Sequence, residues 1–118
     1  MSGLSLRIVR QPITRSDLQR LAREQFGEFI KAVVDVGRGM MAIGGDLHAD
    51  EEAALLQDGA HQSDLWGINL FPDHQGDELI EFDSMINVRP SQGNRSRDVQ
   101  DAATRRRIRE IVEGLISQ

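Results

Sequence analysis

The amino-acid sequence predicts an α+β fold: a single two-layer domain over residues 1–118, with an antiparallel or mixed sheet of four to five strands and three helices. Three observations support this prediction. The apolar patterns follow in the order strand, helix, strand, strand, helix, strand, strand, helix. Short glycine-containing or polar loops separate the paired strands, as in antiparallel hairpins. A chain of 118 residues is long enough for one core and no linker divides it.

The N-terminal part predicts a strand followed by a helix. Residues 4–8 alternate between apolar and polar side chains, which is the two-residue period of a half-buried strand. Thr14 is a good helix N-cap, with Asp17 three residues later as a capping-box partner. Apolar residues then recur at helical spacing until Gly27, which predicts the end of the helix.

The middle of the chain predicts a hairpin and a short helix. Residues 28–36 and 40–45 are rich in strand-forming side chains, and the Gly-Arg-Gly segment between them fits a turn. Residues 49–59 predict a helix, because acidic residues gather in its first turn and Gly59 follows its last turn.

The C-terminal part predicts two more strands and a final helix. The strands are expected over residues 64–72 and 78–90, and the helices are expected to cover one face of the sheet. The helix is expected within residues 98–118, with an apolar stripe of Ile108, Ile111, Val112 and Leu115.

Charge is strongly segregated along the chain. Residues 1–38 carry seven basic and four acidic residues (+3), residues 39–88 carry eleven acidic and no basic residues (−11), and residues 89–118 again carry seven basic and four acidic (+3). The basic ends are therefore expected either to fold back over the acidic middle or to meet it between chains in a homodimer.

Composition excludes several classes of protein. The sequence has no cysteine, which excludes disulfides and thiolate sites. It has no apolar run long enough for a membrane span and no secretion signal, so we expect a cytoplasmic protein.

The segments VVDVGRGMMAIGGDLHADEEAALLQDG, LWGINLFP and EFDSMINVRPSQGNRSR together resemble a family of small, uncharacterised bacterial proteins of about this length. The resemblance covers nearly the whole chain. It implies a domain of unknown function and brings no activity, substrate or catalytic residue.

The segment NVRPSQGNRSRD contains the first candidate site. Pro90 and Gly93 favour a bend whose amides can converge on an anion, and the final helix begins shortly afterwards. The predicted ligand-binding residues are Arg89, Ser91, Asn94, Arg95, Ser96 and Arg97. The alternative is an ionic clasp between these arginines and the acidic middle, within the chain or between subunits.

The segment GDLHADEE contains the second candidate site. In an extended backbone Asp46, His48 and Asp50 would point the same way and could hold a divalent ion or transfer a proton. The simpler interpretation is that Asp46 or Asp50 caps the short helix, whose positive end Glu51 and Glu52 complement. Glu81 and Asp83 also share a strand face, which is typical of either acid–base work or a solvated sheet surface.

The sequence therefore favours a module that binds a phosphorylated or anionic small molecule, or a protein partner, through the Arg89–Arg97 loop. The alternative is a small metal-assisted hydrolase or phosphodiester-cleaving enzyme that uses Asp46, His48 and Asp50. No cofactor is implied. Nucleic acid is disfavoured as a partner, because the acidic middle would repel it and aromatic residues are few.

Overall fold

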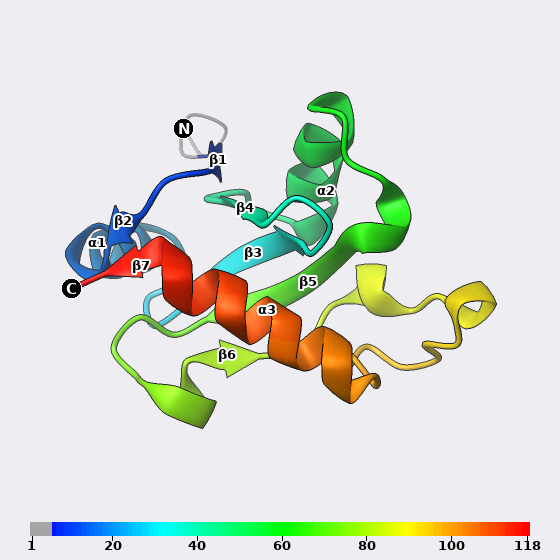
Figure 1. The fold of residues 1–118 in the computed structure, drawn as a ribbon. Helices are drawn as coiled ribbons and strands as arrows, with labels where there is room; N and C mark the ends of the chain where they lie inside the picture. The colour runs from blue at the N-terminus through cyan, green and yellow to red at the C-terminus, as the bar shows by residue number, and fades with distance from the viewer. Residues whose placement is uncertain (1–5) are drawn as a thin grey trace.

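A five-stranded antiparallel sheet in the order β1-β4-β3-β5-β6 forms the centre of the protein (Figure 1). The computed structural model describes residues 6–118. The strands of this sheet are β1 (Arg7–Val9), β3 (Ile30–Asp35), β4 (Met40–Ile43), β5 (Leu65–Leu70) and β6 (Ile80–Glu81). The helices are α1 (Arg15–Gln25), α2 (His48–Gln57) and α3 (Ala102–Leu115), and a small parallel sheet pairs β2 (Ile13–Thr14) with β7 (Ile116–Ser117). The predicted α+β class with three helices is confirmed.

The start of the first helix follows the sequence prediction. Thr14 caps α1, because its Oγ1 accepts a hydrogen bond from the Asp17 amide at 3.1 Å. The helix ends at Gln25, and Gly27 follows with a φ of 92°, a conformation that favours glycine. The preceding strand begins at Arg7, and the part of the prediction that falls on residues 4 and 5 lies outside the described residues.

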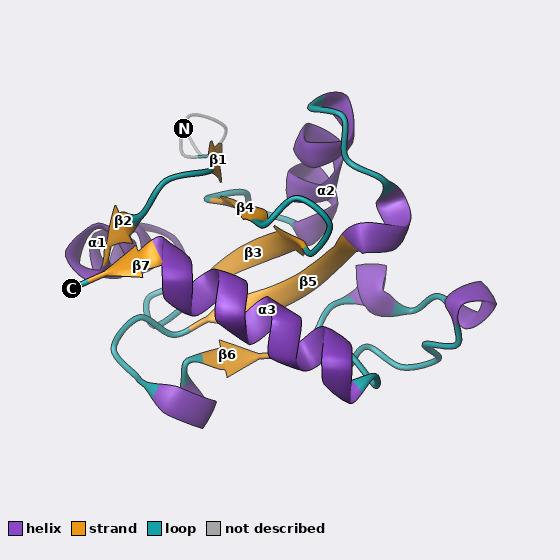
Figure 2. Cartoon of the chain, viewed as in Figure 1, coloured by secondary structure: helices purple, strands orange, loops and turns teal. Residues whose placement is uncertain are grey.

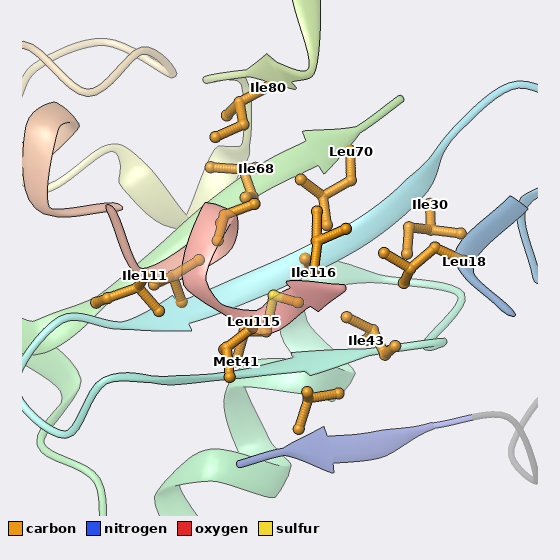
Figure 3. Packing of buried hydrophobic residues seen from close by; sticks show 14 of the residues in the cluster. Leu18, Ile30, Met41, Ile43, Ile68, Leu70, Ile80, Ile111, Leu115 and Ile116 are labelled. Carbon is orange, nitrogen blue, oxygen red and sulfur yellow. The ribbon is translucent and has the colours of Figure 1, made fainter. Parts of the chain in front are cut away.

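The main hydrophobic core lies between one face of the sheet and helices α1 and α3. Alternate residues of β3 and β5 point into it and meet the apolar stripe of α3, which is buried as predicted (Figure 3). The buried members from these three elements are Ile30, Ala32, Val34, Trp66, Ile68, Leu70, Ile108, Ile111, Val112 and Leu115. Each large apolar side chain removed from water contributes about 1.5–3 kcal/mol, so this core accounts for the position of α3 across the sheet.

Helix α2 packs on the opposite face of the sheet, so the expectation of helices on one face only is wrong. Leu55 contacts a smaller cluster made of the alternate residues Val33, Ala42 and Leu65. With ten residues, α2 is only about 15 Å long. It covers the part of this face that carries Val33 and leaves the neighbouring part, which carries Lys31, less covered.

The predicted strand over residues 78–90 is wrong beyond Glu81. After β6 the chain forms 3-10 turns at Met85–Asn87 and Pro90–Gln92, visible among the loops in Figure 2. The Asn87 side chain makes the hydrogen bonds to Gly67 of β5 that a neighbouring strand would otherwise make. It accepts one from the Gly67 amide at 2.8 Å and donates one to the Gly67 carbonyl at 2.9 Å. Gly67 permits this approach, since a Cβ there would lie 2.6 Å from Ser84.

The basic ends of the chain fold back over its acidic middle. Within residues 6–118, five of nine ion pairs join a basic residue of 1–38 or 89–118 to an acidic residue of 39–88. These pairs are Arg10–Asp58, Arg38–Asp58, Arg89–Glu52, Arg97–Asp83 and Arg109–Asp77. The segregation of charge is thus partly compensated inside one chain.

None of the helices in residues 6–118 has the length and apolar content that crossing a bilayer requires.

Candidate functional site

A row of three polar side chains crosses the sheet where α2 begins. The register pairs Lys31 of β3 with Asn69 of β5, and Asn69 with Glu81 of β6. Lys31 and Asn69 share the parity of Val33 and Leu65, so their side chains lie on the α2 face. Directly paired residues on one face have Cβ atoms about 5 Å apart, so these three residues, called here the polar row, are neighbours.

The polar row contains one unpaired cation and one unpaired oxygen. Asn69 is 8% exposed and donates from Nδ2 to a Glu81 carboxylate oxygen at 2.8 Å, while its buried Oδ1 has no hydrogen-bond partner in residues 6–118. Lys31 is half-buried, and within the same residues it forms no ion pair. A buried amide oxygen without a hydrogen-bond donor and a half-buried ammonium group without a carboxylate are both unusual, because polar and charged groups taken from water normally gain a partner.

His48, the first residue of α2, lies beside the polar row. Its Nε2 is 2.8 Å from the Ile68 carbonyl oxygen. A carbonyl can only accept, so Nε2 carries the proton and Nδ1 keeps a lone pair in the neutral ring. Burial lowers the pKa of His48 below the ordinary 6.5, and the positive charges of Lys31 and Arg97 act in the same direction, whereas the Ile68 hydrogen bond and the Asp83 charge oppose this shift. His48 is therefore a neutral imidazole at physiological pH.

Glu51 lies one turn further along α2 and is fully buried. One carboxyl oxygen accepts a hydrogen bond from the Gly45 amide at 3.0 Å, and the other has no partner in the described part of the chain. Burial raises the pKa of Glu51 to about 9, although the Gly45 hydrogen bond and the Lys31 charge act in the opposite direction. At pH 7 this carboxyl group is protonated and carries no charge.

The predicted Arg89–Arg97 loop is largely occupied by contacts within the protein. The Arg89 guanidinium lies 4.8 Å from the Trp66 ring centroid and 3.7 Å from Glu52, and burial lowers its pKa. It donates to three backbone carbonyl groups, those of Gln62, Leu65 and Ile86. Arg97 is paired with Asp83 at 2.6 Å. For Arg89 and Arg97, these contacts favour the internal clasp that the sequence left as the alternative.

The Asn94 side chain and the backbone amides of this loop are also used internally. Asn94 is buried and donates to the carbonyl oxygens of Asn87, Ser96 and Asp98. The amides of residues 92–95 all donate to acceptors of the same chain, so they do not form the open cradle that an anion requires. Ser91 and Arg95 are exposed, and in residues 6–118 neither side chain makes a hydrogen bond. The Ser96 hydroxyl accepts a hydrogen bond from the Asp98 amide at 3.1 Å, and within residues 6–118 it donates none. An external anion at this loop stays a prediction, for which the side chains of Ser91, Arg95 and Ser96 have donors available.

An open hollow of about 500 Å³ lies next to the loop, between it and the start of α3. Neutral amide side chains of Gln92, Asn94 and Gln100 line it, together with the carboxylate of Asp101. Hydrogen bonds from Thr104 lower the pKa of Asp101, so this carboxylate is charged at neutral pH. The hollow therefore carries negative charge and disfavours an anion.

The structure does not assemble Asp46, His48 and Asp50 into a metal site. Helix α2 begins at His48, so His48 and Asp50 are two apart on a helix and point in different directions. In residues 6–118 no three histidine, aspartate or glutamate side chains are grouped as metal ligands. The capping role predicted for Asp46 or Asp50 is also wrong, because the N-cap is Leu47 and no side chain caps this helix.

The two predicted candidate regions do meet in space. Glu52 of α2 contacts Arg89, and both Asp83 and Arg97 act electrostatically on His48. His48 and Arg97 are thus residues that the sequence predicted, whereas Lys31, Asn69 and Glu51 are not. A signal for the first two existed: Lys31 is the one charged residue within the apolar run 29–34, and Asn69 is the one polar side chain in the strand 65–70. Nothing in the sequence distinguished Glu51 from the acidic residues beside it.

Comparison with known proteins places the chain in a family without assigning an activity. No curated protein and no solved structure matches it. The family model described as "Protein of unknown function (DUF5674)" matches residues 7–115, which is nearly the whole chain. The resemblance to an uncharacterised family is confirmed, and the chain belongs to this family of proteins of unknown function.

Proposed function

We propose that this protein binds a small anionic ligand at the polar row, with the Lys31 ammonium group as its main cation. The observation that supports this is the half-buried position of Lys31 on a central strand without a carboxylate partner in residues 6–118. Removing a cation partly from water is unfavourable, and a bound anion would compensate for that loss.

Glu51 is consistent with this proposal, because it would otherwise serve as the counter-ion. Lys31 lowers the pKa of Glu51, so the two groups interact, yet burial keeps Glu51 protonated up to about pH 9. Below that pH the nearby carboxyl group supplies no negative charge to Lys31. We therefore expect the ligand to bind best at neutral pH and to compete with ionised Glu51 above pH 9.

The proposal keeps the predicted class of ligand and changes its location. Arg97 of the predicted loop adds positive potential near His48, although its pairing with Asp83 reduces this effect. Lys31 and Arg95 thus mark two separate locations at which an anion could bind.

The test is titration of the full chain with inorganic phosphate, followed by NMR, for wild type and two variants. Lys31→Met should weaken phosphate binding by about tenfold, because one charge-assisted interaction is worth roughly 1.5 kcal/mol or more. Arg95→Met removes an equal charge from the predicted loop and should change the affinity less than twofold.

The opposite result, with Arg95→Met weakened and Lys31→Met unchanged, would place the anion in the Arg89–Arg97 loop. Absence of phosphate binding to wild type at low salt would refute an anion site at either place. Low salt is required, because screening weakens an exposed charge interaction.

A second candidate function, hydrolysis, is favoured by the geometry of His48. Its Nε2–H is held by the Ile68 carbonyl, so Nδ1 has the lone pair that a general base needs. In this reaction Nδ1 takes a proton from water, the water oxygen forms a bond to the substrate phosphorus or carbonyl carbon, and Lys31 stabilises the oxyanion that forms. The bond from that atom to the leaving group then breaks, and the imidazolium returns its proton to the departing oxygen or to solvent. This differs from the metal-assisted hypothesis, because it uses neither Asp46 nor Asp50.

Hydrolysis of bis(4-nitrophenyl) phosphate provides the test of this second function. His48→Gln should lower the rate at least about 100-fold, whereas Asp46→Asn and Asp50→Asn should leave it unchanged. The rate should fall at acidic pH with a midpoint below 6.5, because burial lowers the pKa of His48. Equal rates for wild type and His48→Gln would exclude His48 as the base.

A further inference from the structure

Three of the four phenylalanines lie outside the hydrophobic cores. The chain has four Phe and one Trp. Phe82 packs against the main core, but Phe26, Phe29 and Phe71 belong to neither buried cluster. Phe26 is 37% exposed, and Phe29 and Phe71 are partly buried. In a protein with so few aromatic residues, the gathering of three at the surface calls for an explanation other than core packing.

These rings form a continuous series, called here the aromatic row, next to the polar row. Phe26 and Phe29 are stacked with centroids 5.0 Å apart and planes 9° apart. Phe29 and Phe71 have centroids 5.4 Å apart and lie just beyond the paired residues Ile30 and Leu70. The row therefore continues the same sheet face that carries Lys31, two residues after Phe29.

The cation and the rings are in direct contact. The Lys31 Nζ lies 5.1 Å from the centroid of the Phe26 ring. This cation–π contact holds the ammonium group over the ring without neutralising its charge. An anion bound to Lys31 would therefore lie beside aromatic surface, where a planar ring attached to that anion could stack.

We infer that the aromatic row holds a planar ring of the ligand, so the ligand class is an aromatic ring that bears one anionic group. This inference rests on the proposed anion site at Lys31 and specifies its ligand. Glu81 belongs to the polar row, and Glu28 and Asp73 lie one and two residues from Phe29 and Phe71 in the sequence, so these three acidic residues would repel a polyanion. A small ligand with one anionic group fits this surface better than a nucleic acid strand.

The experiment compares ligands that contain the ring, the anion or both. Adenosine monophosphate and benzoate carry both, inorganic phosphate and acetate carry only the anion, and adenosine carries only the ring. Binding is measured by NMR titration of the full chain for wild type, Phe26→Leu and Phe71→Leu. Val88→Ala removes apolar surface from a side chain that is also 37% exposed, so it is the control.

In wild type we expect adenosine monophosphate to bind about tenfold more tightly than phosphate, and benzoate about tenfold more tightly than acetate. The phenylalanine variants should lose this advantage and keep the affinity for phosphate. Because the two phenylalanine substitutions are at separate positions, the test stays valid if one variant folds poorly. The control variant Val88→Ala should bind all ligands as wild type does. Comparison of phosphate with acetate, neither of which has a ring, would show whether the preferred anionic group is a phosphate or a carboxylate.

The inference is overturned if ring-bearing anions bind no more tightly than ringless ones, or if their advantage persists in both phenylalanine variants. In that case phosphate binding that depends on Lys31 would still support the proposed function. If no anion bound to the wild-type protein, both this inference and the proposed function would be refuted. The inference would also be overturned if adenosine bound as tightly as adenosine monophosphate. A third contradicting result would be a dimer in sedimentation that depends on Phe71, together with no binding of any ligand.

Discussion

Replacing Glu51 by Gln is expected to stabilise the protein at neutral and alkaline pH. The carboxyl group is fully buried, one of its oxygens is unpaired within residues 6–118, and burial raises its pKa from 4.5 to about 9. Glutamine has nearly the same shape and cannot ionise. The variant therefore keeps the packing on α2 and removes a group whose ionisation opposes folding.

The pH dependence of this effect has a definite sign. Between pH 4.5 and 9 the folded protein holds a proton on Glu51 that the unfolded chain releases, so wild-type stability falls as pH rises. The free energy of unfolding of Glu51→Gln minus that of wild type should therefore increase by about 3 kcal/mol from pH 4.5 to 7, and by about 6 kcal/mol from pH 4.5 to 9. Outside this window the two proteins should respond equally to pH.

Urea unfolding at a series of pH values measures this difference. Glu110→Gln removes an exposed carboxylate from α3 and controls for the loss of one negative charge as such. A Glu51→Gln variant whose stability follows that of wild type at every pH would show that the carboxyl group is ionised in the folded protein. Glu51 would then be the counter-ion of Lys31, and the case for an external anion would weaken.

Replacing Asn87 by Ala is expected to destabilise the protein by about 3–5 kcal/mol. The Asn87 side chain is fully buried, and it bonds the amide and carbonyl of Gly67 and the carbonyl of Arg97. Alanine leaves the Gly67 amide and carbonyl without a partner in the interior, whereas the Arg97 carbonyl still accepts a hydrogen bond from the Ser84 amide at 3.1 Å. Each unpartnered group costs about 1–3 kcal/mol. The loss is a large fraction of the 5–15 kcal/mol that holds a typical domain folded.

Urea unfolding measures the loss, and hydrogen exchange at the Gly67 amide locates it. The amide should exchange much faster in Asn87→Ala than in wild type, because its hydrogen bond is absent. Ser91→Ala, an exposed change in the same segment, should alter stability by less than about 0.5 kcal/mol. A cost below about 1 kcal/mol for Asn87→Ala would mean that water or a local shift restores these bonds.

The first helix and the central hairpin could be predicted from the sequence because local interactions determine them. Thr14 and Asp17 are three residues apart, and their hydrogen bond needs only the helix that they begin. The hairpin of β3 and β4 needs only two apolar runs and a glycine turn. His48 was identified for a similar reason, since a histidine between acidic residues is visible in any local window.

The segment after β6 could not be predicted in this way. Its apolar residues Ile86 and Val88 alternate as in a strand, yet the chain forms 3-10 turns there. The deciding interaction joins Asn87 to Gly67, twenty residues earlier, and depends on the absence of a Cβ at Gly67. Local propensity contains no information about a partner at that distance.

The sequence by itself determined the number of helices, the sheet and the charge blocks, because periodicity and capping act over a few residues. Only the tertiary structure decided that the acidic middle neutralises Arg89 and Arg97 and that Lys31 forms no ion pair within residues 6–118. Lys31 and Asn69 are 38 positions apart, and strand register alone makes them neighbours. The buried side of α2 likewise separates Glu51 from the adjacent acidic residues, since burial depends on which helix face meets the sheet.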